Sequence, residues 1–196
     1  MPSFNIIKRR LSSKKVGIAG SGGLGSNCAV ALARVGVGHL VITDFDKVEE
    51  SNLNRQYYFY DQIGMQKVDA LEVNLLRINP LLQITKYDVK LTPSNIPEIF
   101  ADCDVVVEAF DQASQKQMLI ETILLHYPEK FLVAASGLAG WGGNEKIIQN
   151  TFGNFYICGD LETEVSDDLP PLAPRVGVVS NMQANIVLEI LLGKIL

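Results

Sequence analysis

Short apolar runs alternate with longer segments of helical spacing over the first two thirds of the chain. The short runs predict strands at residues 16–19, 40–43, 84–89, 105–108 and 131–135. Between them, apolar spacing predicts helices at residues 24–35, 65–79, 96–100 and 113–127. Near-continuous apolar strands separated by helices are typical of a mainly parallel sheet with helices on both faces. We therefore expect an α/β fold.

The pattern changes in the last third of the chain. Four glycines fall within residues 137–143. Segments 146–149 and 155–158 predict two short strands, which we expect to be antiparallel. The stretch 159–174 is acidic and contains prolines, which predicts a mobile surface loop. Helical spacing returns at 176–192, where we expect the closing helix.

Length and composition fit one globular domain. The chain has 196 residues, of which 47% are hydrophobic and 20% are charged, so we expect one domain over 1–196 that begins with a basic segment at 1–15. The net charge of −5 argues against a nucleic-acid partner, which usually meets a basic surface. No apolar run approaches the roughly 20 residues that span a bilayer, and no signal peptide is recognisable. These features predict a cytoplasmic protein without a membrane partner.

A glycine-rich turn lies between the first predicted strand and the first predicted helix. Its sequence, Gly-Ser-Gly-Gly-Leu-Gly, fits G-x-G-x-x-G, which lets the backbone approach a phosphate at a helix N-terminus. A carboxylate nineteen residues later ends the second strand, where it can accept hydrogen bonds from ribose hydroxyls. ATP and nicotinamide dinucleotides both satisfy this pattern. The expected nucleotide-binding residues are Gly20, Gly22, Gly23, Leu24, Gly25 and Asp44.

The polar stretch after the second strand is more specific than the glycine turn. Residues 44–56 read D-F-D-K-V-E-E-S-N-L-N-R-Q and resemble the D-x-D-x-V-x-x-S-N-L-x-R-Q signature of the ThiF/MoeB/ubiquitin-activating enzyme family. Further matches follow in order at 64–68 (G-x-x-K-V), 79–80 (Asn-Pro), 108–111 (a strand-end acidic turn) and 173–184 (A-P-x-x-G and a closing helix). The short bacterial ThiF members, which are sulfur-carrier protein adenylyltransferases, are the most similar. The resemblance implies a Rossmann-like fold.

The resemblance implies an ATP-dependent adenylyltransferase. Such an enzyme activates the C-terminal carboxylate of a ubiquitin-like sulfur carrier with a Gly-Gly tail, here a ThiS-like carrier of thiamine biosynthesis, and releases pyrophosphate. Because carboxylate and triphosphate are both anionic, the site must supply cations and align the two groups. By resemblance, Arg55 and Lys67 contact the triphosphate and stabilise charge on the α-phosphate. Asp111 would hold Mg²⁺, which prefers oxygen ligands.

The same resemblance assigns the remaining nucleotide contacts. Asp44 would hold the ribose, while Asn52 and Gln56 would position the phosphates or the neighbouring loop. Asp46 belongs to the signature but receives no defined role. The glycines of 137–143 could line a narrow channel for the carrier tail, since they leave room without side chains.

The family pattern also implies a homodimer, in which an arginine near the N-terminus reaches the neighbouring site. Arg9 or Arg10 could act in this way, or the basic segment could simply be solvated. Longer members hold structural zinc with two C-x-x-C pairs and use a cysteine of a crossover loop. This chain has neither pair, so we expect no zinc. Cys158 precedes the acidic loop and is either a nucleophile or a buried strand residue. We expect a separate sulfur donor protein.

Four alternatives remain open from the sequence. A MoaD-type carrier of molybdopterin synthesis could replace the ThiS-like one. A tRNA-modifying dehydratase of the same family is disfavoured by the acidic balance and by the lack of a basic C-terminal extension. An NAD-dependent oxidoreductase would leave residues 51–56, Lys67 and Asp111 unexplained. A non-catalytic partner that binds nucleotide and docks a ubiquitin-like protein would not need Arg55, Lys67 and Asp111 together.

Overall fold

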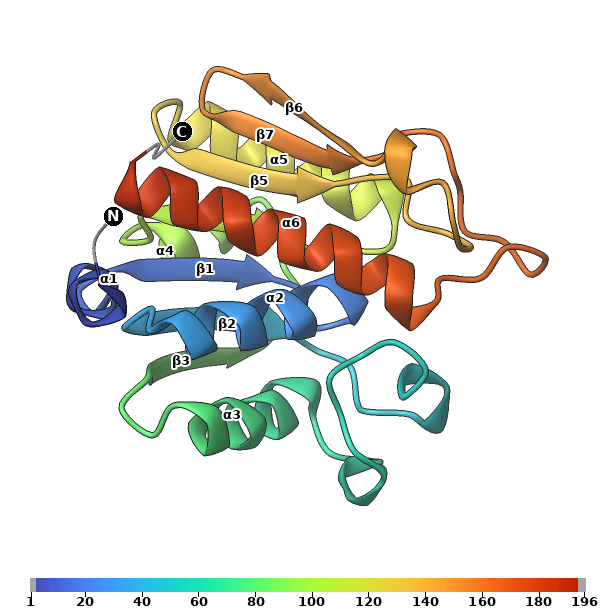
Figure 1. Ribbon diagram of the computed structural model, residues 1–196, viewed down its shortest axis with the longest axis horizontal. Coiled ribbons are helices and arrows are strands. Elements are labelled where there is room, and N and C mark those ends of the chain that lie inside the picture. Colours follow the sequence, from blue (N-terminus) through green and yellow to red (C-terminus); the bar gives the residue numbers. More distant parts are fainter. Residues whose placement is uncertain (1–2, 194–196) are drawn as a thin grey trace.

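The strands form one seven-stranded sheet in the computed structural model, which describes residues 3–193 (Figure 1). The spatial order is β3-β2-β1-β4-β5-β7-β6, and only β6 runs antiparallel to its neighbour. In chain order the strands are β1 (Lys15–Ala19), β2 (His39–Asp44), β3 (Gln83–Asp88), β4 (Val105–Glu108), β5 (Phe131–Ala135), β6 (Ile148–Phe152) and β7 (Phe155–Gly159). This is the Rossmann-like α/β fold that the sequence predicts.

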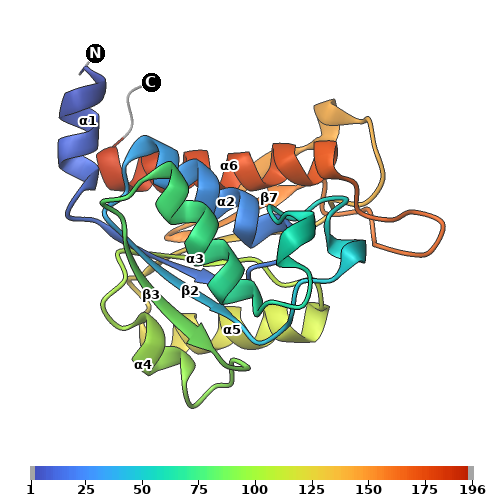
Figure 2. The ribbon, with the colours of Figure 1, turned by 90° about the horizontal axis from the view of Figure 1, so that it is seen from below.

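Helices cover both faces of the sheet (Figures 1 and 2). One face carries α2, α3 and α6, with α1 beside the ends of α2 and α6, while α4 and α5 cover the other face. The bounds are α1 (Phe4–Leu11), α2 (Gly23–Val35), α3 (Lys67–Ile78), α4 (Ile96–Phe100), α5 (Ala113–His126) and α6 (Ala173–Leu192). Short 3-10 turns lie at Glu50–Asn52, Tyr60–Gln62 and Asn144–Lys146.

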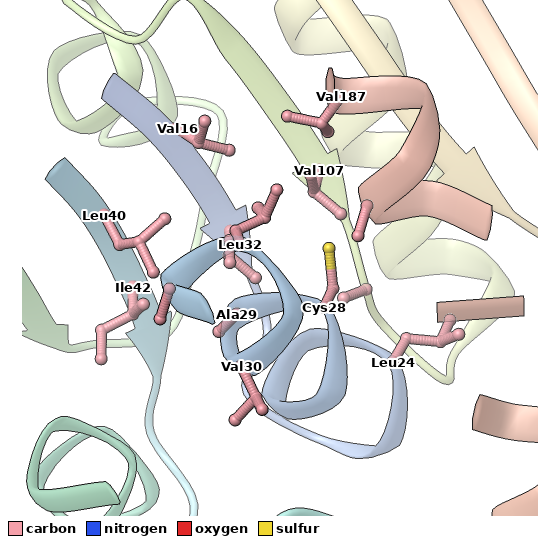
Figure 3. Packing of buried hydrophobic residues seen from close by; sticks show 14 of the residues in the cluster. Val16, Leu24, Cys28, Ala29, Val30, Leu32, Leu40, Ile42, Val107 and Val187 are labelled. Atoms are coloured by element: carbon pink, nitrogen blue, oxygen red, sulfur yellow. The ribbon is translucent and has the colours of Figure 1, made fainter. Parts of the chain in front are cut away.

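The core on the α2 face brings α2 close to strands β1 and β4. Cys28 and Leu32 of α2 are fully buried and point toward Val16 of β1 and Val107 of β4 (Figure 3). This close approach needs a glycine at the start of the helix. A Cβ atom on Gly25 would lie 1.9 Å from the carbonyl oxygen of Gly20. Gly25 therefore serves helix–strand packing, as the third glycine of such turns often does.

The C-terminal third differs from the sequence prediction at the start of β6 and in the acidic segment. Residues 144–146 form a 3-10 turn that directly follows Gly142 and Gly143, both at positive φ, so β6 begins only at Ile148. The two predicted strands are antiparallel to each other, which confirms the expectation, and β7 also pairs in parallel with β5. The segment 159–174, predicted as a mobile surface loop, starts in the last residue of β7, contains the buried Asp160 and overlaps α6, which starts at Ala173.

The strand order places a crevice at one edge of the sheet. From β1 the chain moves outward to β2 and β3, then returns to β4 on the other side of β1. The loops that follow β1 and β4 therefore diverge at the carboxyl ends of two neighbouring strands. In open α/β sheets ligands bind at such a reversal point.

Candidate functional site

A cleft of about 720 Å³ opens at the carboxyl edge of the sheet. One half is lined by the loops after β1, β2 and β3, and the other half by the loops after β5 and β7. The turn between β4 and α5 lies between the two halves, because β4 separates β1 from β5. We call these the first half and the second half of the cleft.

The glycine turn forms the centre of the first half. Gly20, Gly22, Gly23 and Leu24 line the cleft, and Gly20 has a φ of +98°, which favours glycine. Helix α2 starts at Gly23, and no side chain caps its N-terminus. Its first N–H groups and positive partial charge therefore remain for an anion. Gly25, the remaining glycine predicted to bind nucleotide, does not line the cleft.

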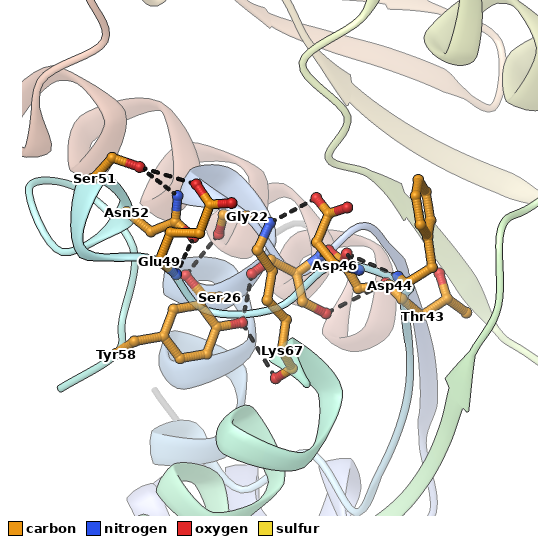
Figure 4. Close-up of polar contacts among 12 residues, drawn as sticks. Gly22, Ser26, Thr43, Asp44, Asp46, Glu49, Ser51, Asn52, Tyr58 and Lys67 are labelled. Atoms are coloured by element: carbon orange, nitrogen blue, oxygen red, sulfur yellow. Dashed lines mark hydrogen bonds and ion pairs between the residues drawn. The ribbon is translucent and has the colours of Figure 1, made fainter. Parts of the chain in front are cut away.

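The Tyr58 hydroxyl connects the glycine turn to the start of α3 (Figure 4). Its hydroxyl donates a hydrogen bond to the carbonyl oxygen of Ser21 at 2.7 Å and lies 3.3 Å from the carbonyl oxygen of Lys67. Burial, and to a smaller extent the charge of Asp44, raises the pKa of Tyr58. The hydroxyl therefore stays protonated and ties the turn to the start of α3.

Tyr58→Phe is expected to weaken nucleotide binding several-fold and to lower the free energy of unfolding by about 1–3 kcal/mol, because the buried Ser21 carbonyl loses its partner. Calorimetric titration with nucleotide and denaturant unfolding measure the two effects. Tyr60→Phe is a matched control, since the Tyr60 side chain is exposed. Equal nucleotide affinities in the Tyr58 variant and wild type would contradict this role.

Asp44 ends β2 and faces the glycine turn (Figure 4). Its Oδ2 accepts the Ser21 N–H at 2.6 Å, and its Oδ1 accepts the N–H groups of Phe45 at 2.9 Å and Asp46 at 3.0 Å. Burial raises the pKa of Asp44, and the charge of Lys67 with these hydrogen bonds opposes that rise only in part. The carboxylate is thus oriented at the edge of the cleft, where it can accept ribose hydroxyls.

The raised pKa predicts a pH-dependent nucleotide affinity. Protonation removes acceptor capacity from Asp44, so affinity should fall as the pH is lowered, with a midpoint above the ordinary carboxyl value of 3.8. Isothermal titration with nucleotide at a series of pH values measures this, with circular dichroism to verify folding. Asp44→Asn should weaken binding at neutral pH and flatten the profile. An unchanged profile in that variant would assign the titration to another group.

Lys67 is the first residue of α3 and lies in the wall of the first half. It is only 7% exposed, and its Nζ donates to Oδ2 of Asp46 at 2.9 Å (Figure 4). The backbone N–H of Lys67 also donates to the carbonyl oxygen of Asp46, at 2.9 Å. A cation at a helix N-terminus is opposed by the helix dipole. Asp46 compensates this on one side, and the cleft can present an anionic ligand on the other.

Arg55 and Gln56 line the cleft next to the glycine turn. Nη1 of Arg55 donates to Oδ1 of Asn54 at 2.8 Å and to the carbonyl oxygen of Ser51 at 3.2 Å, and within residues 3–193 no carboxylate pairs with this guanidinium. Oε1 of Gln56 is buried and has no hydrogen-bond partner among the described residues. An unpaired cation and an unsatisfied buried amide beside a phosphate-type turn fit a polar ligand.

Asn52 does not line the cleft, although it belongs to the same signature. Its Oδ1 accepts the backbone N–H of Glu49 at 3.1 Å and so closes the 3-10 turn Glu50–Asn52. Asn52 therefore shapes the loop that carries Arg55, which is one of the two roles that the sequence left open for it.

Asp111 lies in the turn between the two halves and is exposed to the cleft. Its side chain makes no hydrogen bond or ion pair with the described residues. Helix α5 begins at Ala113 with Gln112 as its N-cap, so Asp111 does not cap it. A free carboxylate in the same cleft as the glycine turn fits Mg²⁺, which commonly takes one or two carboxylates together with substrate phosphates. The described part of the chain has no cluster of three or more metal-ligating side chains.

A buried ion pair fixes the turn that carries Asp111. Oε1 of Glu108 accepts the Phe110 N–H at 2.7 Å, and both oxygens of Glu108 lie 3.0 Å from Nζ of Lys116. Lys116 also donates to the carbonyl oxygen of Ala135 at 2.9 Å. Burial raises the pKa of Glu108, and the charge of Lys116 opposes the rise. The pair links the ends of β4 and β5 to the first turn of α5.

A family model described as "ThiF family" matches residues 7–195. The chain belongs to the ThiF family. It is 34% identical over 193 residues to "Adenylyltransferase and sulfurtransferase UBA4" of Eremothecium gossypii, covering 94% of this chain and 43% of that protein. It is 32% identical over 189 residues to "Adenylyltransferase and sulfurtransferase MOCS3" of Dictyostelium discoideum, covering 92% and 44%. This ThiF-family chain thus spans less than half the length of these curated relatives.

Solved structures share the fold. The crystal structure of Escherichia coli tRNA N6-threonylcarbamoyladenosine dehydratase, TcdA, in complex with ATP superposes with a TM-score of 0.85 at 21% identity, covering 95% of this chain and 88% of that one. At this identity the likeness concerns the fold of the ThiF-family chain. Among the described helices, none is long and apolar enough to cross a membrane.

Cys158 of this ThiF-family chain is a buried residue of β7, which is the second of the two roles that the sequence left open for it. Its Sγ lies 3.5 Å from the carbonyl oxygen of Ala134 and 3.8 Å from that of Val179, and the residue is not exposed. Burial, and then the charge of Glu108, raises the pKa of Cys158 to about 12. The reactive thiolate is therefore scarce at neutral pH.

The N-terminal arginines of the ThiF-family chain lie far from its own cleft. They belong to α1, which precedes β1 and lies at the amino ends of the strands, whereas the cleft is at the carboxyl ends (Figure 1). Nη2 of Arg10 donates to the carbonyl oxygen of Leu192 at 2.8 Å, while Arg9 is exposed. Any action of either arginine on a cleft would require a second subunit.

Sequence reasoning missed two cations near the cleft of this ThiF-family chain. Lys116 gave no signal, because its partner Glu108 is eight positions away and the pairing arises only when α5 folds back on β4. Arg175 had a recognisable signal. It is the third residue of a 20-residue helix in which Glu189 is the only other charged residue. A charged side chain is rarely buried without a partner, so an arginine at a buried helix end is expected to form an ion pair.

Proposed function

We propose that this chain is an ATP-dependent adenylyltransferase that activates the C-terminal carboxylate of a small ubiquitin-like sulfur carrier. The observation that carries the proposal is the division of the cleft. Arg55 and Lys67 flank a glycine turn in the first half, loops of different composition line the second half, and Asp111 lies between them. Family membership and relatives named adenylyltransferases support this reading.

The first half would bind ATP. The uncapped start of α2 would receive phosphate oxygens, Asp44 the ribose, and Arg55 with Lys67 the charge that develops as pyrophosphate leaves. Arginine suits a bidentate phosphate contact, and lysine acts as a point charge. An NAD-dependent oxidoreductase would leave these two cations unexplained. Asp111 would be an oxygen ligand of Mg²⁺, which neutralises phosphate charge when bound.

The second half would receive the polypeptide tail. Its wall contains Ser136, Gly137 and Leu138, so the tail channel predicted for residues 137–143 is narrowed here to the beginning of that segment. Gly140 does not border open space, because a Cβ atom there would lie 2.7 Å from Cδ1 of Leu169. The carboxylate oxygen would attack the α-phosphorus from this side, opposite the departing pyrophosphate.

The finer assignments belong to the same proposal. We place the protein in thiamine biosynthesis with a ThiS-like carrier that ends in Gly-Gly, acting in the cytoplasm as a homodimer with a separate sulfur donor protein. MoaD-type activation for molybdopterin synthesis is the alternative within this activity. The fold shared with TcdA supports a second candidate, a tRNA-modifying dehydratase that also activates a carboxylate, although the net charge of −5 does not favour tRNA.

Exchange of labelled pyrophosphate into ATP tests the proposal. The protein is incubated with ATP, Mg²⁺ and, in separate reactions, a ThiS-like carrier, a MoaD-like carrier or threonylcarbamoyl-modified tRNA. We expect exchange with the ThiS-like carrier and none when its terminal glycine is removed. Exchange only with the MoaD-like carrier would change the pathway, and exchange only with the tRNA would replace the function. No exchange with any acceptor, despite tight ATP binding, would contradict adenylation.

A further inference from the structure

Arg175, the third residue of α6, joins two loops that are far apart in the sequence. It is only 5% exposed, and its Nη2 lies 2.5 Å from Oδ2 of Asp160, which directly follows β7. Its Nη1 donates to the carbonyl oxygen of Gly142 in the glycine-rich loop after β5. We call these three residues the latch. None of them lines the cleft.

The other carboxylate oxygen of Asp160 organises the acidic loop. Oδ1 accepts the N–H groups of Glu162 and Thr163, both at 2.9 Å, and the Thr163 hydroxyl lies 3.0 Å from Oδ1 and 2.9 Å from Oδ2. Thr163 and the next two residues, Glu164 and Val165, line the second half of the cleft. The orientation of one carboxylate therefore sets the position of this stretch of the wall.

The same loop is joined to the glycine-rich loop at both of its ends. The Asp160 N–H donates to the carbonyl oxygen of Gly137 at 3.2 Å, and the Gly140 N–H donates to that of Pro170 at 2.9 Å. A Cβ atom on Gly137 would lie 1.9 Å from Oδ1 of Asp160. The two loops are thus joined by backbone hydrogen bonds at these two points, and the latch adds the side-chain connection between them.

The backbone beside the latch is strained. Leu161 has a φ of +61° and is the single non-glycine residue with positive φ in the described chain. Such conformations are held only when surrounding contacts determine them, and they cluster at functional sites. The hydrogen bonds of Asp160 on one side and the wall residues on the other supply those contacts.

Two of the three latch residues, Arg175 and Asp160, form a buried ion pair, whose removal from water costs free energy. Removing charges from water offsets much of their attraction, so such pairs often contribute specificity in place of stability. Burial would raise the pKa of Asp160, but the hydrogen bonds from Thr163 and Glu162 and the charge of Arg175 together lower it below the ordinary value of 3.8. The pair is therefore ionised at neutral pH.

We propose that Arg175 is a positioning residue for the carboxylate-bearing acceptor. It holds the acidic and glycine-rich loops together, and these loops form the wall of the second half against which the acceptor binds. This inference rests on the proposed function for the identity of the acceptor. Arg175 does not touch the acceptor or the nucleotide. Its loss should widen the second half and leave the first half unchanged, because Lys67, Arg55 and Asp44 are attached to other elements.

Arg175→Met tests this with steady-state pyrophosphate exchange and calorimetric titration of nucleotide. We expect the KM for the acceptor to rise on the order of tenfold or more, while the Kd for ATP and the kcat at saturating acceptor stay within about twofold. Arg175→Lys keeps the charge but has one donor group, so it should show an intermediate KM. Arg77→Met is the control, because Arg77 is an exposed arginine in the last turn of α3.

Two further measurements protect the test against misfolding and against failure of the proposed function. If Arg175→Met does not fold, the Asp160→Asn/Arg175→Met double variant, which buries no unpaired charge, should fold and show the raised KM. Limited proteolysis should cut residues 161–170 faster in the variants than in wild type, with unchanged ATP affinity, even if no acceptor supports exchange. Equal cleavage rates, an unchanged acceptor KM, or parallel losses in ATP and acceptor binding would overturn the proposal.

Discussion

Lys67→Ala is expected to slow carboxylate activation by about 100- to 1000-fold, the usual effect of removing one oriented group that stabilises transition-state charge. Lys67 is positioned by α3 and by its ion pair with Asp46, so its Nζ needs little reorganisation to meet a phosphate. Nucleotide binding should weaken less than turnover, because charge on the α-phosphate and leaving group grows in the transition state.

The fold should tolerate this change, since the Asp46 side chain is 52% exposed and remains hydrated without its partner. Lys86→Ala is the matched control. Lys86 also forms ion pairs with carboxylates, those of Asp69 and Glu72, but it lies outside the cleft. Exchange rates with the acceptor, measured for both variants at saturating ATP, give the comparison. Similar exchange rates for the Lys67→Ala and Lys86→Ala variants would show that Lys67 takes no part in the reaction.

Asp111→Asn is expected to lower Mg²⁺-dependent exchange by about 100-fold or more, because the amide supplies one weaker ligand in place of a carboxylate. The effect should appear as a higher Mg²⁺ concentration for half-maximal rate and as a lower maximum. Nucleotide affinity without Mg²⁺ should stay the same or improve slightly, since a negative charge next to the phosphates is removed.

Replacing Asp111 should disturb no other interaction, because its side chain has no partner in the described chain and does not cap α5. Stability should therefore change little. Asp61→Asn serves as control, since Asp61 is an exposed aspartate in the 3-10 turn Tyr60–Gln62. Wild-type Mg²⁺ dependence in Asp111→Asn would show that another group holds the metal.

Most of the parallel part of the fold follows from the sequence because its central strands are short apolar runs, whereas the edge strand β3 alternates apolar and polar residues. Val105–Glu108 and Phe131–Ala135, for example, have the predicted bounds, since strands that are buried on both faces read as short apolar runs. The β6–β7 hairpin was less predictable. Its strands are short and partly exposed, and its position beside β5 is determined by α6, which packs across β5 and β7 from the far end of the chain.

The candidate site was also predictable only in part. Residues 44–56 are contiguous, so the resemblance identified that segment as a unit, and only the contacts of Asn52 distinguish a loop-shaping residue from those that line the cleft. The latch could not be found like this. Asp160 looked like one of several acidic surface residues, and its burial depends on Arg175, fifteen positions later, and on the positive φ of Gly137.

Transfer of oxygen-18 from the acceptor tests most directly whether a carboxylate attacks the α-phosphorus in this cleft. The sulfur carrier is prepared with oxygen-18 in its C-terminal carboxylate and incubated with the protein, ATP and Mg²⁺, and the product is then cleaved at the acyl carbon with hydroxylamine. The account predicts AMP that carries the heavy oxygen, and unlabelled pyrophosphate. Unlabelled AMP, or ADP together with labelled phosphate, would contradict it.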